Sequence, residues 1–150
     1  MIQKTPETEI VRSFLKALEG MDLGQALTYV SDDIEYQNMP LPPVRGPKGI
    51  SRIMAPVLKT SGFEARINKI AAHGSTVLTE RTDAVLIGPV RIPFQVCGTF
   101  EVRDDRIVLW RDTFDWASGL VNIVIAGPLY LFRRLSMTIA LKIAARKSSP

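Results

Sequence analysis

In this 150-residue chain, Arg81 and Asp83 have the residue types and the spacing that most clearly indicate a functional site. They lie in the run Thr76–Ile87 and share their odd-numbered positions with the apolar Val77 and Ile87. Because side chains alternate between the two faces of a strand, these four residues are predicted to share one face. If the apolar side chains point into a core, a guanidinium and a carboxylate point there too, and an unpaired buried charge costs several kcal/mol. We therefore expect Arg81 and Asp83 to be paired, functional, or both.

Two further strand patterns direct polar groups into the same interior. Asp112 shares its parity with Trp110 in an apolar run, and Tyr36 and Asn38 follow Ile34 with the same two-residue spacing. The sequence therefore predicts a buried polar site made of two carboxylates, one arginine and two neutral hydrogen-bonding groups.

An arginine between two buried carboxylates can hold one of them ionised, while burial and like-charge repulsion keep the other protonated at neutral pH. One carboxyl group is then an acid and the other a base, so together they can protonate a leaving oxygen and deprotonate a water in one step. Tyr36 and Asn38 can hold that water. The single histidine, His73, precedes Gly74 in a predicted turn, and the sequence has no nucleophile elbow, metal-spaced ligand set or glycine-rich phosphate loop. We therefore expect no competing chemistry, no metal and no cofactor.

Three helices are predicted before Gly62. Each carries an apolar stripe at helical spacing, and the first two begin at residues suited to capping a helix. The predicted helices run from Pro6 to near Gly20 after the Thr5 cap, from Asp22 to Val30, and from Ile50 to Leu58 with a disturbance at Pro56. The prolines between Met39 and Val44 predict a rigid loop directly after Asn38.

After Gly62 the pattern changes to strands separated by short turns. The predicted strands are residues 63–72, 76–87, 91–103 and 106–115. Because each turn is short, these strands are expected to pair antiparallel as a meander. Three helices and a curved sheet predict an α+β fold in which the helices cover one face of the sheet and close a cone-shaped pocket.

The length of 150 residues predicts a single domain that ends in a helical tail. The net charge of +4 comes partly from basic residues of this tail and accompanies no nucleic-acid-binding motif, so we expect no nucleic-acid partner. Cys97 is the single cysteine, which excludes an internal disulfide and favours a reducing, cytoplasmic location. The N-terminus has no pattern of a signal peptide.

The tail, residues 117–150, is strongly apolar in part and basic toward its end. Its apolar stretch 120–132 is broken at Gly127-Pro128 and is shorter than the roughly 18 to 20 residues that span a bilayer. A helix is predicted over 129–147. We expect the tail to pack over the pocket or a dimer interface rather than to contact a membrane.

Three short motifs together resemble one known family. They are Tyr-Gln-Asn at 36–38, Glu-Arg-Thr-Asp at 80–83 and Trp-Arg-Asp-Thr-Phe-Asp at 110–115. In their order and separation these motifs resemble the limonene-1,2-epoxide hydrolase family. The resemblance covers residues 7–116, which we therefore take as the core of the domain. The resemblance implies a curved mixed sheet with packed helices, the cystatin-like arrangement shared with nuclear transport factor 2 and ketosteroid isomerase, and a homodimer.

The resemblance also implies an activity and a role for each site residue. The activity is cofactor-independent hydrolysis of an apolar epoxide, such as a cyclic terpene oxide, to a vicinal diol by direct attack of water. Asp83 is then the acid that protonates the epoxide oxygen, and Asp112 is the base that activates water. Arg81 bridges the two carboxylates, while Tyr36 and Asn38 help Asp112 to position the water.

Two other functions use the same fold. A ketosteroid-isomerase-like enzyme would transfer a proton with an aspartate base facing an oxyanion hole, whereas here the inward carboxylates are linked to an arginine. A non-catalytic module for hydrophobic-ligand binding or dimerisation would not need the complete set of acid, base and water holders. Epoxide hydrolysis is therefore the favoured interpretation.

Overall fold

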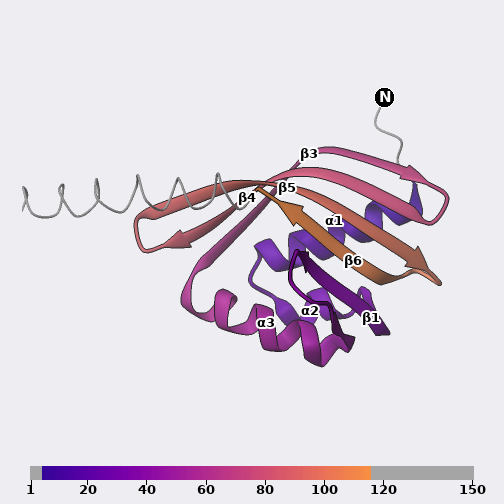
Figure 1. The fold of residues 1–150 in the computed structure, drawn as a ribbon, viewed down its shortest axis with the longest axis horizontal. Helices are drawn as coiled ribbons and strands as arrows, with labels where there is room; N and C mark the ends of the chain where they lie inside the picture. Colours follow the sequence, from indigo (N-terminus) through magenta and orange to yellow (C-terminus); the bar gives the residue numbers. More distant parts are fainter. Residues whose placement is uncertain (1–4, 116–150) are drawn as a thin grey trace, which may run out of the picture. The chain divides into compact units, whose positions relative to one another are not determined.

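The computed structural model describes residues 5–115, and in them the predicted α+β arrangement of three helices and one sheet is confirmed (Figure 1). The elements are α1 (Pro6–Glu19), α2 (Leu23–Leu27), β1 (Val30–Met39), β2 (Val44–Arg45), α3 (Gly46–Thr60), β3 (Gly62–His73), β4 (Thr76–Ile87), β5 (Val90–Arg103) and β6 (Arg106–Phe114). The helical tail predicted for residues 117–150 lies outside the described residues.

The first two helices begin at the residues that the sequence predicts. The Thr5 hydroxyl accepts a hydrogen bond from the backbone N–H of Thr8, and the Thr8 hydroxyl accepts one from the backbone N–H of Thr5, which satisfies two donors that the first turn leaves unpaired. At α2 the Asp22 carboxylate accepts from the backbone N–H of Gln25 at 2.8 Å. This helix ends at Leu27 and is shorter than predicted, because the chain enters β1 within three residues.

Helix α3 starts earlier than predicted. It begins at Gly46 rather than at Ile50, and it continues past Pro56 to Thr60. Pro56 has no N–H to donate to the carbonyl of Arg52, one turn earlier, but Arg52 is exposed to solvent. That carbonyl can be solvated, so the helix tolerates the proline.

The sheet has the strand order β2-β1-β6-β5-β4-β3. Strands β3 to β6 form the predicted antiparallel meander, and β1 pairs parallel with β6, so the sheet is mixed as the resemblance implies. The parallel pairing brings the N-terminal strand β1 beside the C-terminal strand β6, although about 70 residues separate them, and joins all three motifs in one sheet.

The helices pack against one face of this sheet (Figure 1). Phe14 of α1 lies edge-on to Trp110 of β6 at 4.9 Å between ring centroids, and Trp110 lies 4.0 Å from the ring of Tyr36 on β1. Fully burying a large apolar side chain contributes roughly 1.5–3 kcal/mol to stability. This aromatic cluster therefore fixes α1, β1 and β6 relative to one another. Among residues 5–115 no helix is both long and apolar enough to cross a membrane.

The inward alternation of β4 holds at its centre and fails at its end. Val77, Thr79, Arg81 and Asp83 are buried as predicted, whereas Ile87 is 55 % exposed. Figure 1 shows that the β4–β5 hairpin projects beyond α1, α2 and α3, so none of the helices within residues 5–115 covers the end of β4. The alternation of residues along β4 does not by itself indicate where the covering helices end.

Candidate active site

The strand register brings the predicted site residues to one region of the helix-covered face. Thr79 on β4 is paired with Gly98 on β5, Gly98 with Asp112 on β6, and Asp112 with Asn38 on β1. Directly paired residues of neighbouring strands present their side chains on the same face. Three separate motifs thus meet across four strands.

Arg81 lies at the centre of this region and binds both predicted carboxylates. Its Nε and Nη2 donate to Asp83 Oδ1 and Oδ2 at 3.2 and 3.1 Å, and Nη2 also donates to Asp112 Oδ2 at 2.8 Å. The side chain is fully buried, and its guanidinium lies 5.8 Å from the ring centroid of Phe100. We call Arg81, Asp83 and Asp112 the buried triad.

The triad carries more negative than positive charge when both carboxylates are ionised. One proton on either carboxyl group makes it electrically neutral. Burial raises the pKa of Asp83 to about 6, an effect that Arg81 opposes and that the charges of Asp112 and Glu19 reinforce. Burial acting alone would lower the pKa of Arg81, but Asp112 and Asp83 raise it, so the guanidinium stays charged. Asp83 therefore keeps a proton to a higher pH than an ordinary aspartate does.

Tyr36 and Asn38 lie on β1, which pairs with the strand of Asp112, and Asn38 is the register partner of Asp112. The Asn38 side-chain amide donates to the Tyr36 hydroxyl. Burial raises the pKa of that phenol above its usual range, and the nearby Asp112 carboxylate adds to the effect, so Tyr36 remains a neutral hydroxyl. Asp112 Oδ1 is buried and accepts no hydrogen bond from residues 5–115. Neutral polar groups and one open carboxylate oxygen are the partners that a bound water needs.

Gly98 is a site residue that the sequence analysis missed. It lies within β5 on the inward face, between the buried Val96 and Phe100. A Cβ atom built on Gly98 would lie 2.6 Å from Arg81 Nη1 and 2.9 Å from Asp112 Oδ1. A glycine inside an otherwise regular strand was the available signal, because it marks a place where another group approaches the backbone closely.

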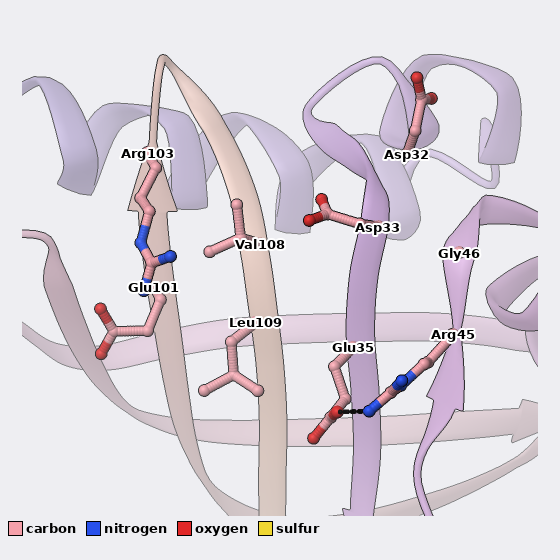
Figure 2. A pocket seen from close by; sticks show the side chains of 9 residues that line it. All are labelled: Asp32, Asp33, Glu35, Arg45, Gly46, Glu101, Arg103, Val108 and Leu109. Carbon is pink, nitrogen blue, oxygen red and sulfur yellow. Dashed lines mark hydrogen bonds and ion pairs between the residues drawn. The ribbon is translucent and has the colours of Figure 1, made fainter.

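A groove of about 670 Å³ lies on the opposite face of the sheet (Figure 2). Val108 and Leu109 of β6 lie between Arg103 on one side and the acidic side chains of β1 on the other, where Glu35 pairs with Arg45 at 3.4 Å. Asp33 and Glu35 have the parity opposite to that of Tyr36 and Asn38. This groove is therefore separate from the triad. Within residues 5–115 no group of three or more His, Cys, Asp or Glu side chains is placed to hold a metal ion.

Fold and site together define an α+β protein of the nuclear transport factor 2-like class with two buried carboxyl groups joined by an arginine. The family model of the limonene-1,2-epoxide hydrolase catalytic domain matches residues 5–124. The chain is 45% identical to epoxide hydrolase EphG of Mycobacterium tuberculosis over 105 residues, which is 70% of each chain. It is also similar to the solved structure of an LEH-like epoxide hydrolase from M. tuberculosis, with 37% identity and a TM-score of 0.78 over 85% of this chain and 96% of that one.

The chain therefore belongs to the limonene-1,2-epoxide hydrolase family and is an epoxide hydrolase of that type. A protein with a ketosteroid isomerase-like fold from Catenulispora acidiphila is 20% identical, with a TM-score of 0.69 over 76% of this chain and 91% of that one. That likeness concerns the fold alone.

Proposed function

We propose that this chain hydrolyses an apolar epoxide to a vicinal diol in one concerted step that needs no cofactor, with Asp83 as the acid and Asp112 as the base. The observation that carries the proposal is the buried Arg81 Nη2, which lies 3.1 Å from Asp83 Oδ2 and 2.8 Å from Asp112 Oδ2. Two carboxyl groups held in fixed relation to one buried cation have the separate environments that acid and base catalysis require.

In the proposed step the oxygen of a water attacks one epoxide carbon while the bond from that carbon to the epoxide oxygen breaks. Asp112 takes a proton from the attacking water, and Asp83 gives its proton to the epoxide oxygen. The product is a diol, and the proton that Asp112 gained must return to Asp83 before the next turnover.

Arg81 can serve both the reactant and the product state, because the triad has no net charge in either of them. Before the step Asp83 is protonated and Asp112 is ionised, and afterwards the two states are exchanged. The guanidinium contacts both carboxyl groups, so it can stabilise either ionised form without moving. The raised pKa of Asp83, about 6, supports its assignment as the acid.

Tyr36 and Asn38 position the water in this proposal. Asn38 is the register partner of Asp112, and its side-chain amide is tied to the Tyr36 hydroxyl, so both groups are oriented before a substrate binds. Asp112 Oδ1 is open to accept the proton of that water. A nucleophile held in this way reacts faster because the entropy of positioning has already been lost.

The side chains next to the acid favour an apolar substrate. Phe94 is the register partner of Asp83, and Phe114 is the register partner of Val96, so both rings lie on the face of the triad. Their centroids are 5.7 Å apart, and both side chains are partly exposed. Aromatic surface next to a few fixed polar groups is typical of small-molecule sites.

The ketosteroid-isomerase-like alternative is less well supported by the same geometry. It requires an aspartate base opposite an oxyanion hole, whereas both inward carboxylates here are hydrogen-bonded to one arginine. No contact within residues 5–115 favours it over hydrolysis.

The direct test is diol formation from a panel of epoxides that includes cyclic terpene oxides, in buffer without added metal or nucleotide. A single turnover in heavy-oxygen water then separates direct attack from a covalent ester. We expect the label in the diol from the first turnover, because water attacks the epoxide itself. Label found in the carboxyl group of Asp83 or Asp112 would contradict the mechanism.

We also propose that the protein forms a two-fold dimer, as the resemblance implies, through the face of the sheet that α1, α2 and α3 leave open (Figure 1). A cytoplasmic location, expected from the single cysteine, remains a prediction.

A further inference from the structure

We propose that Gly98 is a positioning residue of the triad: its missing side chain leaves the space through which the Arg81 guanidinium crosses β5 to hold Asp112. The catalytic part of this inference rests on the function proposed above.

Arg81 and Asp112 belong to strands that are not neighbours. Arg81 lies on β4 and Asp112 on β6, with β5 between them. The guanidinium must therefore pass over the inward face of β5 to make its 2.8 Å contact. At the crossing point β5 carries Gly98, which is the register partner of both Thr79 and Asp112.

The space at Gly98 is already filled by atoms of the site. A Cβ would lie 2.6 Å from Arg81 Nη1, 2.6 Å from Thr79 Oγ1 and 2.9 Å from Asp112 Oδ1, all shorter than the 3.0 Å below which neighbouring atoms must shift. These atoms cannot move freely. Arg81 is fully buried and is hydrogen-bonded to both carboxylates, and Thr79 is buried and stiff about its first side-chain torsion.

The backbone itself does not explain the glycine. Gly98 lies outside the left-handed region that favours glycine, in contrast to Gly74 and Gly88, each of which has a φ of +57°. An interior strand position disfavours glycine, since it has no side chain to pack. The close approach of the arginine is therefore the physical reason for glycine at this position.

A methyl group at residue 98 would act selectively. Arg81 reaches Asp83 along its own strand, two residues away, and does not cross β5 to do so. A methyl group would push the guanidinium away from Asp112 and leave the contact with Asp83 possible. The absence of a side chain at Gly98 therefore lets Arg81 contact Asp112 and Asp83 at the same time.

The test compares Gly98→Ala with Gly62→Ala. A Cβ on Gly62 would also be crowded, at 2.8 Å from Leu86 Cδ1 and 2.9 Å from Leu86 Cβ, but it meets an apolar side chain and no member of the triad. We expect Gly98→Ala to lower kcat for diol formation by about 10²-fold, the size of loss that follows when a reacting group is misplaced by an ångström. KM should change by less than about threefold, because the change acts on the chemical step.

Gly62→Ala should keep kcat. Equal kcat in the two variants would overturn the proposal.

A second measurement does not depend on turnover. Arg81→Lys keeps the positive charge but lacks the Nη1 atom that a residue 98 Cβ would meet. If the proposal is correct, Gly98→Ala lowers the urea midpoint of unfolding less in the Arg81→Lys background than in the wild type, while Gly62→Ala lowers it equally in both. The same loss from Gly98→Ala in both backgrounds would overturn the proposal. This comparison remains decisive if the wild type forms no diol, a result that would count against the proposed function alone.

Discussion

The two carboxylates of the triad differ in how they bind the arginine. Both oxygens of Asp83 accept hydrogen bonds from Arg81, whereas Asp112 uses Oδ2 for this contact and keeps Oδ1 open. A base needs a free lone pair directed at the proton it removes. The geometry therefore favours Asp112 over Asp83 for that role, in agreement with the raised pKa of Asp83.

Asp112→Asn tests this assignment of the base. The amide keeps the size of the side chain and an oxygen that can accept from Arg81, but it cannot take a proton from water. We expect turnover to fall by at least the ~10²–10⁴-fold of lost general base catalysis, while the melting temperature stays near that of the wild type or rises. Diol assays and thermal melts measure both effects.

The matched control is Asp33→Asn, which makes the same change on the opposite face of β1, where the carboxylate is exposed. It should leave turnover unchanged. If Asp112→Asn retained more than about a tenth of the wild-type rate, general base catalysis by Asp112 would be negligible and the proposed mechanism would be wrong.

The pKa of Asp83 predicts how activity depends on pH. The acid acts only while protonated, and burial raises its pKa from an ordinary value of 3.8 to about 6. The protonated fraction is therefore high below pH 6 and falls about tenfold per pH unit above it, so kcat/KM should decline on the alkaline side with the pKa of the free enzyme.

Profiles of kcat/KM against pH, together with carbon NMR titration of the Asp83 carboxyl group, check this prediction. The two measurements should give the same pKa. An NMR titration of Asp83 near the ordinary value of 3.8, or a kcat/KM that stays constant as the pH rises well above 6, would refute the role of Asp83 as the acid.

At the scale of the element, the alternation of apolar and polar residues was sufficient to predict the strands of the meander. The predicted strand 76–87 has the same bounds as β4, the predictions for β5 and β6 differ by one residue at one end, and the prediction for β3 differs by one residue at each end. The parity of Tyr36, Arg81, Asp83 and Asp112 correctly placed them in the interior. Local patterning succeeds here because one face of each strand is covered by helices.

Local patterning could not supply the contacts between elements. Whether β1 pairs with β6 depends on long-range packing; the resemblance implied a mixed sheet, and the parallel pairing of these two strands is seen first in the structure. The crossing of Arg81 over Gly98 likewise depends on the order of β4, β5 and β6 in the sheet. The end of helical cover near Ile87 was missed for the same reason.

The triad also joins strands β4 and β6, so Arg81→Ala should reduce stability as well as activity. The substitution leaves two buried carboxylates without their positive partner, and breaking a buried pair in this way costs about 3–5 kcal/mol. We expect this loss in the free energy of unfolding, measured by urea denaturation, together with the loss of diol formation.

Arg45→Ala is the matched control, because Arg45 pairs with Glu35 at 3.4 Å on the exposed face, and its side chain is 81% exposed. Exposed pairs contribute about 0–1 kcal/mol, so this variant should stay close to the wild type. Similar losses of stability in Arg81→Ala and Arg45→Ala would show that the triad does not stabilise the sheet.

At the scale of the whole molecule, the described residues place nearly all their apolar packing on one side of the sheet. The aromatic rings of Phe14, Tyr36, Phe100 and Trp110 gather between the sheet and the helices. The other face carries the exposed Leu78 and the groove whose floor is Val108 and Leu109. None of the three described helices lies over this face, so its apolar side chains form a natural surface for a second copy.

The groove has the charge pattern that a two-fold interface requires. In a two-fold dimer the same surface patch of each copy contacts that of the other copy. A charged patch of this kind therefore needs both positive and negative side chains around its apolar centre. Here Asp33, Glu35 and Arg45 lie on one side of Leu109, and Glu101 and Arg103 lie on the other, so each side carries both signs of charge (Figure 2). Two copies related by such an axis can therefore pair unlike charges across an apolar contact.

Leu109→Glu tests this interface, because it places a carboxylate at the apolar centre and opposes it to its own copy. We expect the wild type to sediment as a dimer at micromolar concentration and Leu109→Glu to shift toward the monomer, since an unpaired charge in a buried interface is unfavourable. Lys59→Glu is the control, because Lys59 is exposed on α3, on the side of the helices, and should leave the dimer intact. A wild-type monomer under these conditions would remove the proposed dimer. A dimer that withstands Leu109→Glu would place the interface elsewhere on the molecule, away from the groove.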